Sequence, residues 1–301
     1  MTLAMIGLGR MGANMAMRLM KGGHSIVGYD PSAEARARIV DAGGSGAASL
    51  EELASKLPTP RIFWIMVPAG APVDQTIAGL LPHLQSGDIL IDGGNSNFKD
   101  SMRRAEELRP KGVAFVDAGT SGGIWGLNEG YSMMIGGDEK VVEYLCPIFQ
   151  TLAPAKDQGW GRVGVSGAGH YVKMVHNGIE YGLMQAYAEG LSLLKHKKDF
   201  GFDVHQISEI WRYGSVVRSW LLDLTADALA KNPELEGIAP IVADSGEGRW
   251  TVFEAIENDV PAPIMTLALL ERIRSRDKES FSDKLLMAMR NEFGGHPIVK
   301  E

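Results

Sequence analysis

The chain has 301 residues, of which 45% are hydrophobic and 22% charged, with a formal net charge of −7 and a pI near 5.6. These values are typical of a globular protein with one large or two moderate domains, and the acidic balance argues against nucleic acid as a partner. No apolar run reaches transmembrane length, we expect no signal peptide, and the single cysteine, Cys146, allows no internal disulfide. We therefore expect a cytoplasmic protein that does not bind membranes.

A glycine-rich turn lies close to the N-terminus. The apolar residues 3–6 lead into Gly7-Leu8-Gly9-Arg10-Met11-Gly12, and helix-forming residues follow. A G-x-G-x-x-G run alone is also compatible with an ordinary glycine turn, but here it stands between a predicted strand and a predicted helix. In a dinucleotide-binding motif the glycines allow the tight turn and close approach to a pyrophosphate, and the helix N-terminus attracts the phosphates. These six residues are the predicted cofactor-binding loop.

The choice of cofactor depends on the end of the next predicted strand, residues 25–29. Asp30 follows that strand, eighteen positions after Gly12. A carboxylate at this place accepts hydrogen bonds from the ribose hydroxyls of NAD and repels the 2′-phosphate of NADP. No arginine follows it directly, although Arg36 is one helical turn further on and could reach back. We predict NAD as the cofactor, with NADP possible.

Strands and helices continue to alternate, which predicts an α/β N-terminal domain with a Rossmann-type, doubly wound parallel sheet. The predicted strands are residues 61–67, 88–92, 113–117 and 131–135, and the predicted helices are 34–42, 49–57, 73–81, 99–109 and 140–151. Ligands of such a sheet bind beyond the carboxyl ends of its strands. The residues predicted there are Val67 and Pro68 for the cofactor, Asn95 for both ligands, and Ser121, Gly122 and Gly123 for the substrate. Asn and Ser are also common turn residues for purely local reasons.

Glycines recur between residues 159 and 169, and we interpret this stretch as a hinge between two domains. Residues 1–165 form the predicted dinucleotide-binding domain, and residues 166–301 an all-α C-terminal domain for substrate binding and oligomerisation. After the first long helix, its predicted helices are 204–213, 219–231, 251–258, 263–276 and 280–291.

One long, mostly buried helix is predicted from near Gly169. Lys173, His176, Asn177 and Glu180 occupy offsets 0, 3, 4 and 7 and therefore share one helical face, which Tyr181 flanks. Apolar residues cover much of the remaining circumference.

A buried lysine and glutamate are costly unless polar groups meet them. They could form an internal ion pair, or an acid–base pair facing a cleft in which His176 and Asn177 orient a substrate. Gly178 and Gly182 favour the second interpretation. Each destabilises a helix interior by roughly 1 kcal/mol relative to alanine, and close approach of a ligand or another backbone would explain why glycine is nevertheless present.

Cationic residues recur in the helical half. Arg249 lies by a predicted helix N-terminus, Arg272 lies near the end of the 263–276 helix, and Arg290 and His296 flank the turn at residues 293–295. Each alone is compatible with a solvated surface charge. Together, in a domain that follows a nucleotide-binding sheet, they suggest a phosphate pocket.

The run His170-Tyr171-Val172-Lys173-Met174-Val175-His176-Asn177-Gly178-Ile179-Glu180-Tyr181 closely resembles the catalytic helix of the decarboxylating 6-phosphogluconate dehydrogenases, within the β-hydroxyacid dehydrogenase superfamily. Other members of the superfamily usually carry Lys-x-x-Asn-Asn without the following glutamate. The resemblance, which runs from Gly7 to His296, implies that Lys173 is the general base and later an acid, and that Glu180 is the acid that protonates an enediol. It implies substrate contacts for His176, Asn177, Tyr181, Asn95, Ser121, Gly122 and Gly123.

The resemblance also covers the cationic residues. The stretch 244–251 is similar to the one that carries the family's phosphate-contacting lysine, but here that cation is absent or displaced to Arg249. Arg272 aligns with a phosphate-binding arginine, and residues 290–296 match a tail that reaches a neighbouring subunit's site. This implies a homodimer or homotetramer of the short bacterial form. Asp30-Pro31-Ser32 differs from the Asn-Arg-Thr of NADP-using relatives, and Gly9 replaces a common alanine, which favours NAD or dual use.

The implied reaction is the oxidative decarboxylation of 6-phosphogluconate to ribulose 5-phosphate and CO₂ in the pentose phosphate pathway. Neutral Lys173 would take the proton of the C3 hydroxyl, its ammonium would then assist loss of CO₂, and Glu180 would protonate C1 of the enediol. Because no cluster of carboxylates, cysteines or histidines has metal-ligand spacing, we expect no metal. Two alternatives stay open: an NAD(P)-dependent 3-hydroxyacid dehydrogenase or semialdehyde reductase without decarboxylation, and an NAD-sensing regulator without turnover.

Overall fold

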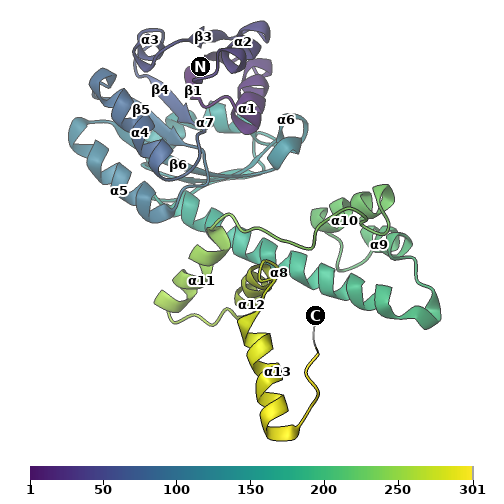
Figure 1. Ribbon diagram of the computed structural model, residues 1–301. Helices are drawn as coiled ribbons and strands as arrows, with labels where there is room; N and C mark the ends of the chain where they lie inside the picture. Colours follow the sequence, from purple (N-terminus) through teal and green to yellow (C-terminus); the bar gives the residue numbers. More distant parts are fainter. Residues whose placement is uncertain (300–301) are drawn as a thin grey trace. The chain divides into compact units, whose positions relative to one another are not determined.

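The computed structural model describes residues 1–299, apart from the side chain of Phe293. The chain divides into two compact units, Met1–His176 and the part from Asn177 onward. The first unit is an eight-stranded sheet flanked by helices, and the second is helical (Figure 1). The predicted fold class, a Rossmann-type α/β domain followed by an all-α domain, is confirmed. The expected boundary between residues 165 and 166 stays a prediction.

The strands of the sheet lie in the order β3-β2-β1-β4-β5-β6-β7-β8. Their bounds are β1 Thr2–Ile6, β2 Ser25–Tyr29, β3 Ser45–Ala47, β4 Ile62–Ile65, β5 Ile89–Asp92, β6 Ala114–Ser121, β7 Ser132–Gly136 and β8 Trp160–Gly164. Reversal of strand order at β1 and β4 produces the crevice at which doubly wound sheets bind nucleotides. All neighbouring pairs are parallel except β6 and β7, which are antiparallel, so the expectation of a wholly parallel sheet is wrong at this edge.

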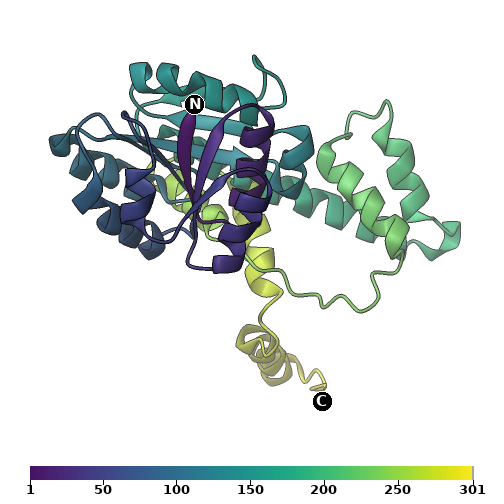
Figure 2. The ribbon, with the colours of Figure 1, turned by 90° about the horizontal axis from the view of Figure 1, so that it is seen from above.

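Helices cover both faces of the sheet, α1, α2 and α7 on one and α3, α4 and α5 on the other (Figures 1 and 2). The bounds of the helices in this unit are α1 Arg10–Lys21, α2 Ala33–Asp41, α3 Leu50–Ser55, α4 Ala71–Leu80, α5 Phe98–Leu108, α6 Gly126–Glu129 and α7 Glu139–Leu152, with short 3-10 turns at η1 Leu81–His83, η2 Arg109–Lys111 and η3 Gly123–Trp125. Strands with two covered faces need continuous apolar runs, as in β1 and β4.

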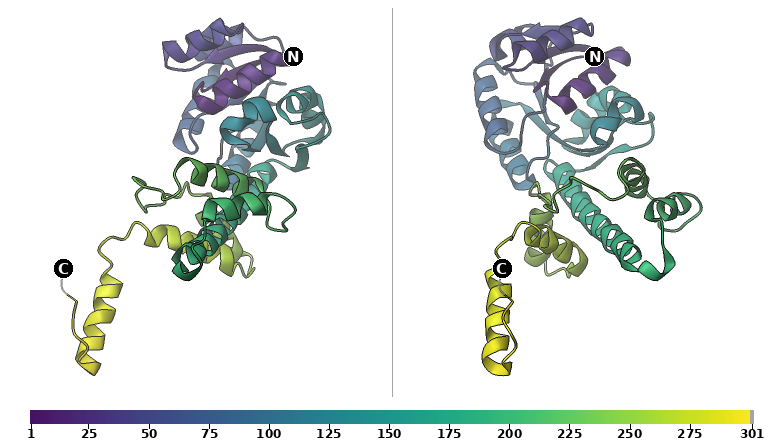
Figure 3. Two further views of the ribbon diagram at one scale, coloured as in Figure 1. Left: turned by 90° about the vertical axis from the view of Figure 1, so that its right-hand side faces the viewer. Right: turned by 45° about the vertical axis from the view of Figure 1, so that its right-hand side comes forward.

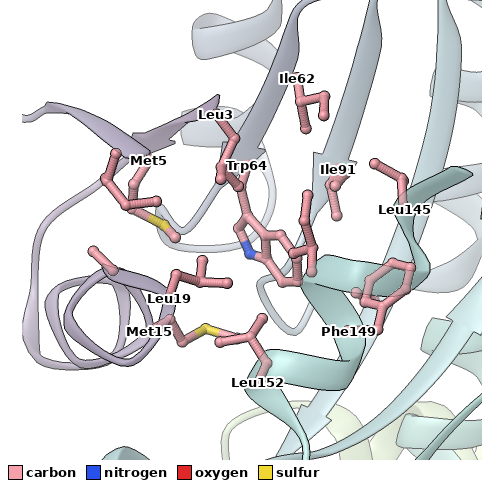
Figure 4. Close-up of a cluster of buried hydrophobic side chains, with 14 of the residues drawn as sticks. Leu3, Met5, Met15, Leu19, Ile62, Trp64, Ile91, Leu145, Phe149 and Leu152 are labelled. Carbon is pink, nitrogen blue, oxygen red and sulfur yellow. The ribbon is translucent and has the colours of Figure 1, made fainter. Parts of the chain in front are cut away.

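Trp64 of β4 lies at the centre of the hydrophobic core on the α1 face of the sheet, between side chains of α1 and α7 (Figure 4). Its ring meets that of Phe149 edge to face at 6.0 Å, and Phe149 stacks on Trp160 at 5.6 Å. Trp160 belongs to β8, so the interpretation of residues 159–169 as a hinge is wrong for residues 160–164, which complete the sheet. The stacked aromatic rings attach this strand to the core.

The helical part begins with α8, which runs Ala168–His196 and continues from the first unit into the second. The other helices are α9 Val204–Arg212, α10 Trp220–Lys231, α11 Glu247–Glu257, α12 Pro263–Arg274 and α13 Phe281–Gly294, with a 3-10 turn at η4 Lys198–Phe200. Helix α11 begins four residues earlier than predicted, because Gly246, with φ +104°, ends the preceding loop there. None of the helices within residues 1–299 is long and apolar enough to cross a membrane.

An apolar groove of about 580 Å³ lies between α8, α9 and α10, lined by residues such as Leu191, Leu221 and Leu224. Figure 3 shows α9 and α10 beside the C-terminal part of α8. Apolar side chains of α8 are also exposed in the single chain, with Leu193 at 74%. The expectation of a mostly buried helix is therefore wrong for the single chain, because polar Lys173 and Asn177 are buried while Ile179 and Leu193 are not.

Candidate functional site

The glycine loop after β1 has the geometry that a dinucleotide needs. Gly7 has φ +91°, in the left-handed region, and a Cβ there would come within 2.6 Å of the Met66 carbonyl oxygen. A Cβ on Gly12 would collide with the Gly7 carbonyl. A Cβ on Gly9, in contrast, would meet no atom of the described chain within 4 Å. The first and third glycines are thus required by the protein's own packing, and the second borders open space.

Helix α1 begins at Arg10, within this glycine-rich run, and presents its N-terminus to the same space. Gly9 is the N-cap residue, none of the described side chains caps the helix, and its first turn carries no acidic residue. Its leading N–H groups and the helix dipole can therefore bind an anion such as a pyrophosphate. Of the residues between these glycines, Leu8 is buried and Arg10 is exposed.

Asp30 is held against this loop at the end of β2. Its two carboxylate oxygens accept hydrogen bonds from Leu8 N–H at 2.8 Å and Ser32 N–H at 2.9 Å. Each oxygen keeps a further lone pair for a ribose hydroxyl. The Arg36 guanidinium does reach back, donating to the carbonyl oxygens of Asp30 at 2.6 Å and Pro31 at 3.0 Å. The site therefore fits NAD, and it also holds the Arg36 cation beside the backbone of Asp30.

The turn after β5, which carries the predicted ligand residue Asn95, is fixed from below by a buried ion pair. Asp92 accepts hydrogen bonds from Gly94 N–H at 3.1 Å and from the Ser96 hydroxyl at 2.7 Å, and Arg104 Nη1 lies 3.2 Å from it. Arg104 of α5 also donates to the carbonyl of Gly70, at the end of the loop that contains Val67 and Pro68. One arginine thus connects two predicted ligand loops. The Asn95 side chain is exposed above this network.

The turn after β6 has the backbone that its glycines were expected to provide. Ser121 is the last residue of β6 and is half-buried. Gly122 and Gly123 have φ +130° and +52°, which L-amino acids with side chains rarely adopt. The chain therefore turns sharply directly after Ser121.

Lys173 lies in the second turn of α8 and is only 5% exposed. Its Nζ is 3.4 Å from Nδ1 of His176, one turn further along the same face. Asn177 is buried, Glu180 is half-buried, and Tyr181 is buried next to them in sequence. The predicted polar stripe is thus formed on one uninterrupted helix.

The two glycines of α8 that suggested close approach are explained by packing against neighbouring helices. A Cβ on Gly178 would lie 2.6 Å from the Thr251 methyl group of α11, and one on Gly182 would lie 3.3 Å from Ile264 of α12. Their neighbours are side chains, so the expectation of a ligand or another backbone at these glycines is wrong.

Tyr181 contacts the predicted phosphate-site residue Arg272 in the second unit. The Arg272 guanidinium stacks on its ring at 3.6 Å and donates to the Ala243 carbonyl at 2.9 Å. The Tyr181 hydroxyl accepts a hydrogen bond from Ser245 N–H at 3.3 Å. Arg272 is therefore held beside the loop that precedes α11.

Arg249 is brought to the same loop, but its guanidinium is already paired with a carboxylate. Its Nε and Nη2 lie 2.9 and 3.1 Å from the two Asp244 oxygens, and Arg276 Nη1 lies 2.9 Å from one of them. Hydrogen bonds from Arg249 and then from Arg276 lower the pKa of Asp244 to about 2. Arg290, on α13, and His296, just after it, are exposed, and the Asn291 amide donates to the His296 carbonyl at 2.8 Å.

Three supporting residues were not found from the sequence, namely Asp92, Arg104 and Asp244. Each belongs to a residue type that is common on surfaces. Only the fold shows that Asp92 and Arg104 are buried and paired with each other, and that the half-buried Asp244 is paired with Arg249. Within residues 1–299 there is no group of three or more His, Cys, Asp or Glu side chains that could hold a metal ion. Metal independence stays a prediction.

Two family profiles together match nearly the whole chain. The NAD binding domain of 6-phosphogluconate dehydrogenase matches residues 2–166, and the 6-phosphogluconate dehydrogenase C-terminal domain matches residues 169–293. The chain belongs to the 6-phosphogluconate dehydrogenase family.

Individual members of this family are similar over the full length of the chain. A Haloferax volcanii 6-phosphogluconate dehydrogenase described as NAD(+)-dependent and decarboxylating is 43% identical, over 100% of this chain and 99% of its own. A Bacillus subtilis relative is 40% identical over 100% of both chains. The decarboxylating enzyme of Haemophilus influenzae is 38% identical, but the chain spans only 63% of its length.

A solved structure of a 6-phosphogluconate dehydrogenase is also similar to this chain. A Plasmodium falciparum 6-phosphogluconate dehydrogenase, described in apo form and in complexes with NADP⁺ and 6-phosphogluconate, has a TM-score of 0.84 and 31% identity, and the match covers 100% of this chain and 66% of that one. A 3-hydroxyisobutyrate dehydrogenase of Mycobacterium tuberculosis has a TM-score of 0.75 at 21% identity, which indicates a shared fold alone.

Proposed function

We propose that the protein is an NAD-dependent 6-phosphogluconate dehydrogenase that converts 6-phosphogluconate to ribulose 5-phosphate and CO₂. The observation that carries this proposal is Lys173, buried on the face of α8 that also bears His176, Asn177 and Glu180. Members of the wider fold group that only oxidise a hydroxyacid have no need for the glutamate of this face. Full-length similarity to an NAD(+)-dependent, decarboxylating relative supports the same reaction.

Lys173 and Glu180 do the acid–base work of the reaction. Bound NAD supplies the acceptor for the hydride that leaves C3 of the substrate. Lys173 in its neutral form, which burial favours, accepts the proton of the C3 hydroxyl, so that a 3-keto acid forms. The Lys173 ammonium then donates to the ketone oxygen, where negative charge develops as CO₂ leaves. The carboxyl of Glu180 gives a proton to C1 of the enediol, and Asn95, Ser121, Gly122, Gly123, His176 and Asn177 orient the sugar acid.

NAD is the preferred cofactor, held by the loop from Gly7 to Gly12, by Asp30, and by Val67, Pro68 and Asn95. The carboxylate of Asp30, fixed by two backbone N–H groups, favours a ribose diol. The nearby guanidinium of Arg36 supports some use of NADP, which is the cofactor of the Plasmodium falciparum enzyme.

The substrate phosphate is assigned to Arg272, Arg249 and Tyr181, with Arg290 and His296 contributed by a neighbouring subunit. We propose a cytoplasmic homodimer or homotetramer with a dinucleotide-binding domain of residues 1–165 and a helical domain of residues 166–301. The exposed apolar residues of α8 and the groove beside α10 support assembly, because a single chain leaves this apolar surface in water.

The experiment that tests the proposal supplies NAD and 6-phosphogluconate labelled at C1, and follows both the absorbance of reduced nicotinamide and the release of labelled CO₂. We expect the two to appear in equal amounts. Reduced nicotinamide without CO₂ would indicate a simple hydroxyacid dehydrogenase or semialdehyde reductase. NAD binding without any reduction would indicate a regulator.

A further inference from the structure

The first turn of α8 is tied to the sheet by a carboxylate of β6. Asp117 is fully buried, and its Oδ1 and Oδ2 accept hydrogen bonds from Gly167 N–H at 2.6 Å and His170 N–H at 2.8 Å. These N–H groups stand where a helix begins and have no intrahelical acceptor of their own. Asp117 therefore caps α8 from a different element, and its charge meets the positive end of the helix dipole.

A third buried hydrogen bond ties the same turn to α5. Nδ1 of the His170 ring lies 2.7 Å from the hydroxyl of Ser101, and both side chains are buried. The start of α8 is thus bound to the sheet on one side and to α5 on another. A shift of this turn relative to β6 or to α5 would break a buried hydrogen bond.

Gly119 sets how closely α8 approaches β6. It lies two residues after Asp117, on the same face of the strand. A Cβ on Gly119 would lie 2.5 Å from Cβ of Lys173 and 2.7 Å from the Gly169 carbonyl oxygen. The φ angle of Gly119 is outside the left-handed region, so this position needs glycine for space and not for backbone conformation.

Gly169, on the helix side of the same contact, also leaves no room for a Cβ. A Cβ there would lie 2.5 Å from the Asp117 carbonyl oxygen and 2.7 Å from the Gly136 nitrogen. Backbone therefore meets backbone where α8 crosses β6 and β7, with no side chain to act as a compressible spacer. The stem of Lys173 rests directly on the strand.

We infer that Asp117 and Gly119 form a docking clamp that positions the amine of Lys173 for proton transfer. The inference rests on the proposed function, in which Lys173 is the base. Asp117 and Gly119 are positioning residues that act through Lys173. A misplacement of about 1 Å can cost on the order of 10²-fold in rate, so the clamp controls turnover more than binding.

Gly119→Ala tests the clamp by adding one methyl group and no new chemistry. Gly161→Ala is the matched control, since it also places alanine in a strand of this sheet but its Cβ would meet nothing within 4 Å among the described atoms. The measurements are kcat and KM for 6-phosphogluconate, NAD affinity by protein fluorescence, and the rate of reductive methylation of Lys173 read by mass spectrometry. We expect kcat of Gly119→Ala to fall at least about tenfold, while KM and NAD affinity are retained. The rate of methylation should change at Lys173 and stay the same at the other lysines.

Asp117→Asn gives the same test if Gly119→Ala does not fold. The asparagine oxygen can accept a hydrogen bond from one of the two N–H groups, but its NH₂ group then faces the other N–H group, so one hydrogen bond is lost. A folded variant of either kind with the kcat and the Lys173 methylation rate of Gly161→Ala overturns the inference. If the wild type neither reduces NAD nor releases CO₂, the proposed function fails, whereas altered Lys173 methylation in Gly119→Ala would still support the clamp.

Discussion

Lys173 is the residue on which the proposed chemistry depends most. We expect Lys173→Met to lower kcat at least about 10²-fold, because no neutral amine then accepts the C3 hydroxyl proton. NAD affinity should be retained, since the dinucleotide loop lies on other elements. Initial rates and an NAD titration measure both quantities, with Lys21→Met, at the exposed end of α1, as the control. Turnover close to that of the control would remove Lys173 from the role of base.

Asp244 makes the stability of the second unit depend on pH. Its pKa is lowered to about 2 by Arg249 and Arg276, below the value of about 3.9 for an unfolded aspartate. Because the folded-state pKa is the lower one, the carboxylate contributes its full stability above the unfolded pKa, and this contribution is lost as the pH falls toward the folded pKa.

We therefore expect Asp244→Asn to lower the free energy of unfolding by about 1–3 kcal/mol near neutral pH. The difference from the wild type should shrink as the pH falls from about 4 toward 2. Urea unfolding at a series of pH values measures it, and Asp41→Asn, at the exposed end of α2, matches the change in charge. A difference that stays constant to the lowest pH would show that the ion pairs are not its source.

Replacement of Gly190 or Gly178, both in α8, by alanine should change the free energy of unfolding in opposite directions. A Cβ on Gly190 would point into open space as far as the described residues go, so Gly190→Ala should raise the free energy of unfolding by about 0.5–1 kcal/mol through helix propensity. A Cβ on Gly178 would come within 2.6 Å of the Thr251 methyl group, so Gly178→Ala should destabilise the fold despite the same propensity gain. Urea unfolding of both variants measures the two changes in the free energy of unfolding. Changes of the same sign would contradict this account of the packing.

Elements with a strong local pattern were predictable from the sequence, and those defined by their partners were not. Apolar strands β1, β2 and β5 and the helices between them agree with the prediction to within a few residues. Strand β3, Ser45–Ala47, was missed because three small residues at a sheet edge carry no periodicity. Strand β8 was read as a hinge because its glycines hide a strand that is held by pairing with β7 and by the Trp160 ring.

The same distinction applies to the site. The spacing of Lys173, His176, Asn177 and Glu180 predicts one helical face, since helical geometry alone puts them there. The supports of that face could not be predicted, because Asp117 and Gly119 are separated from Lys173 by more than fifty positions in the chain and come next to the start of α8 only after the sheet has formed. Arg104 likewise lies within a helix whose charged sequence suggests a solvated surface.

The complete molecule is proposed to be an oligomer in which residues after α12 serve a neighbouring site, and subunit mixing tests this directly. Lys173→Met removes the base, and Arg290→Ala removes an exposed cation of α13. Each homo-oligomer should have low activity. If the tail of one subunit completes the site of another, a hybrid dimer contains one site with Lys173 from one chain and Arg290 from the other.

Random reassociation of equal amounts of the two inactive variants should then restore about a quarter of the wild-type activity, because half of the dimers are hybrids and each has one intact site. Denaturation and refolding of the mixture, followed by the NAD reduction assay, measures the recovery. Separate refolding of each variant provides the control for refolding itself. Activity equal to the mean of the two controls would mean that Arg290 serves the site of its own chain, or none, and would contradict the proposal that the C-terminal residues of one subunit complete the site of another.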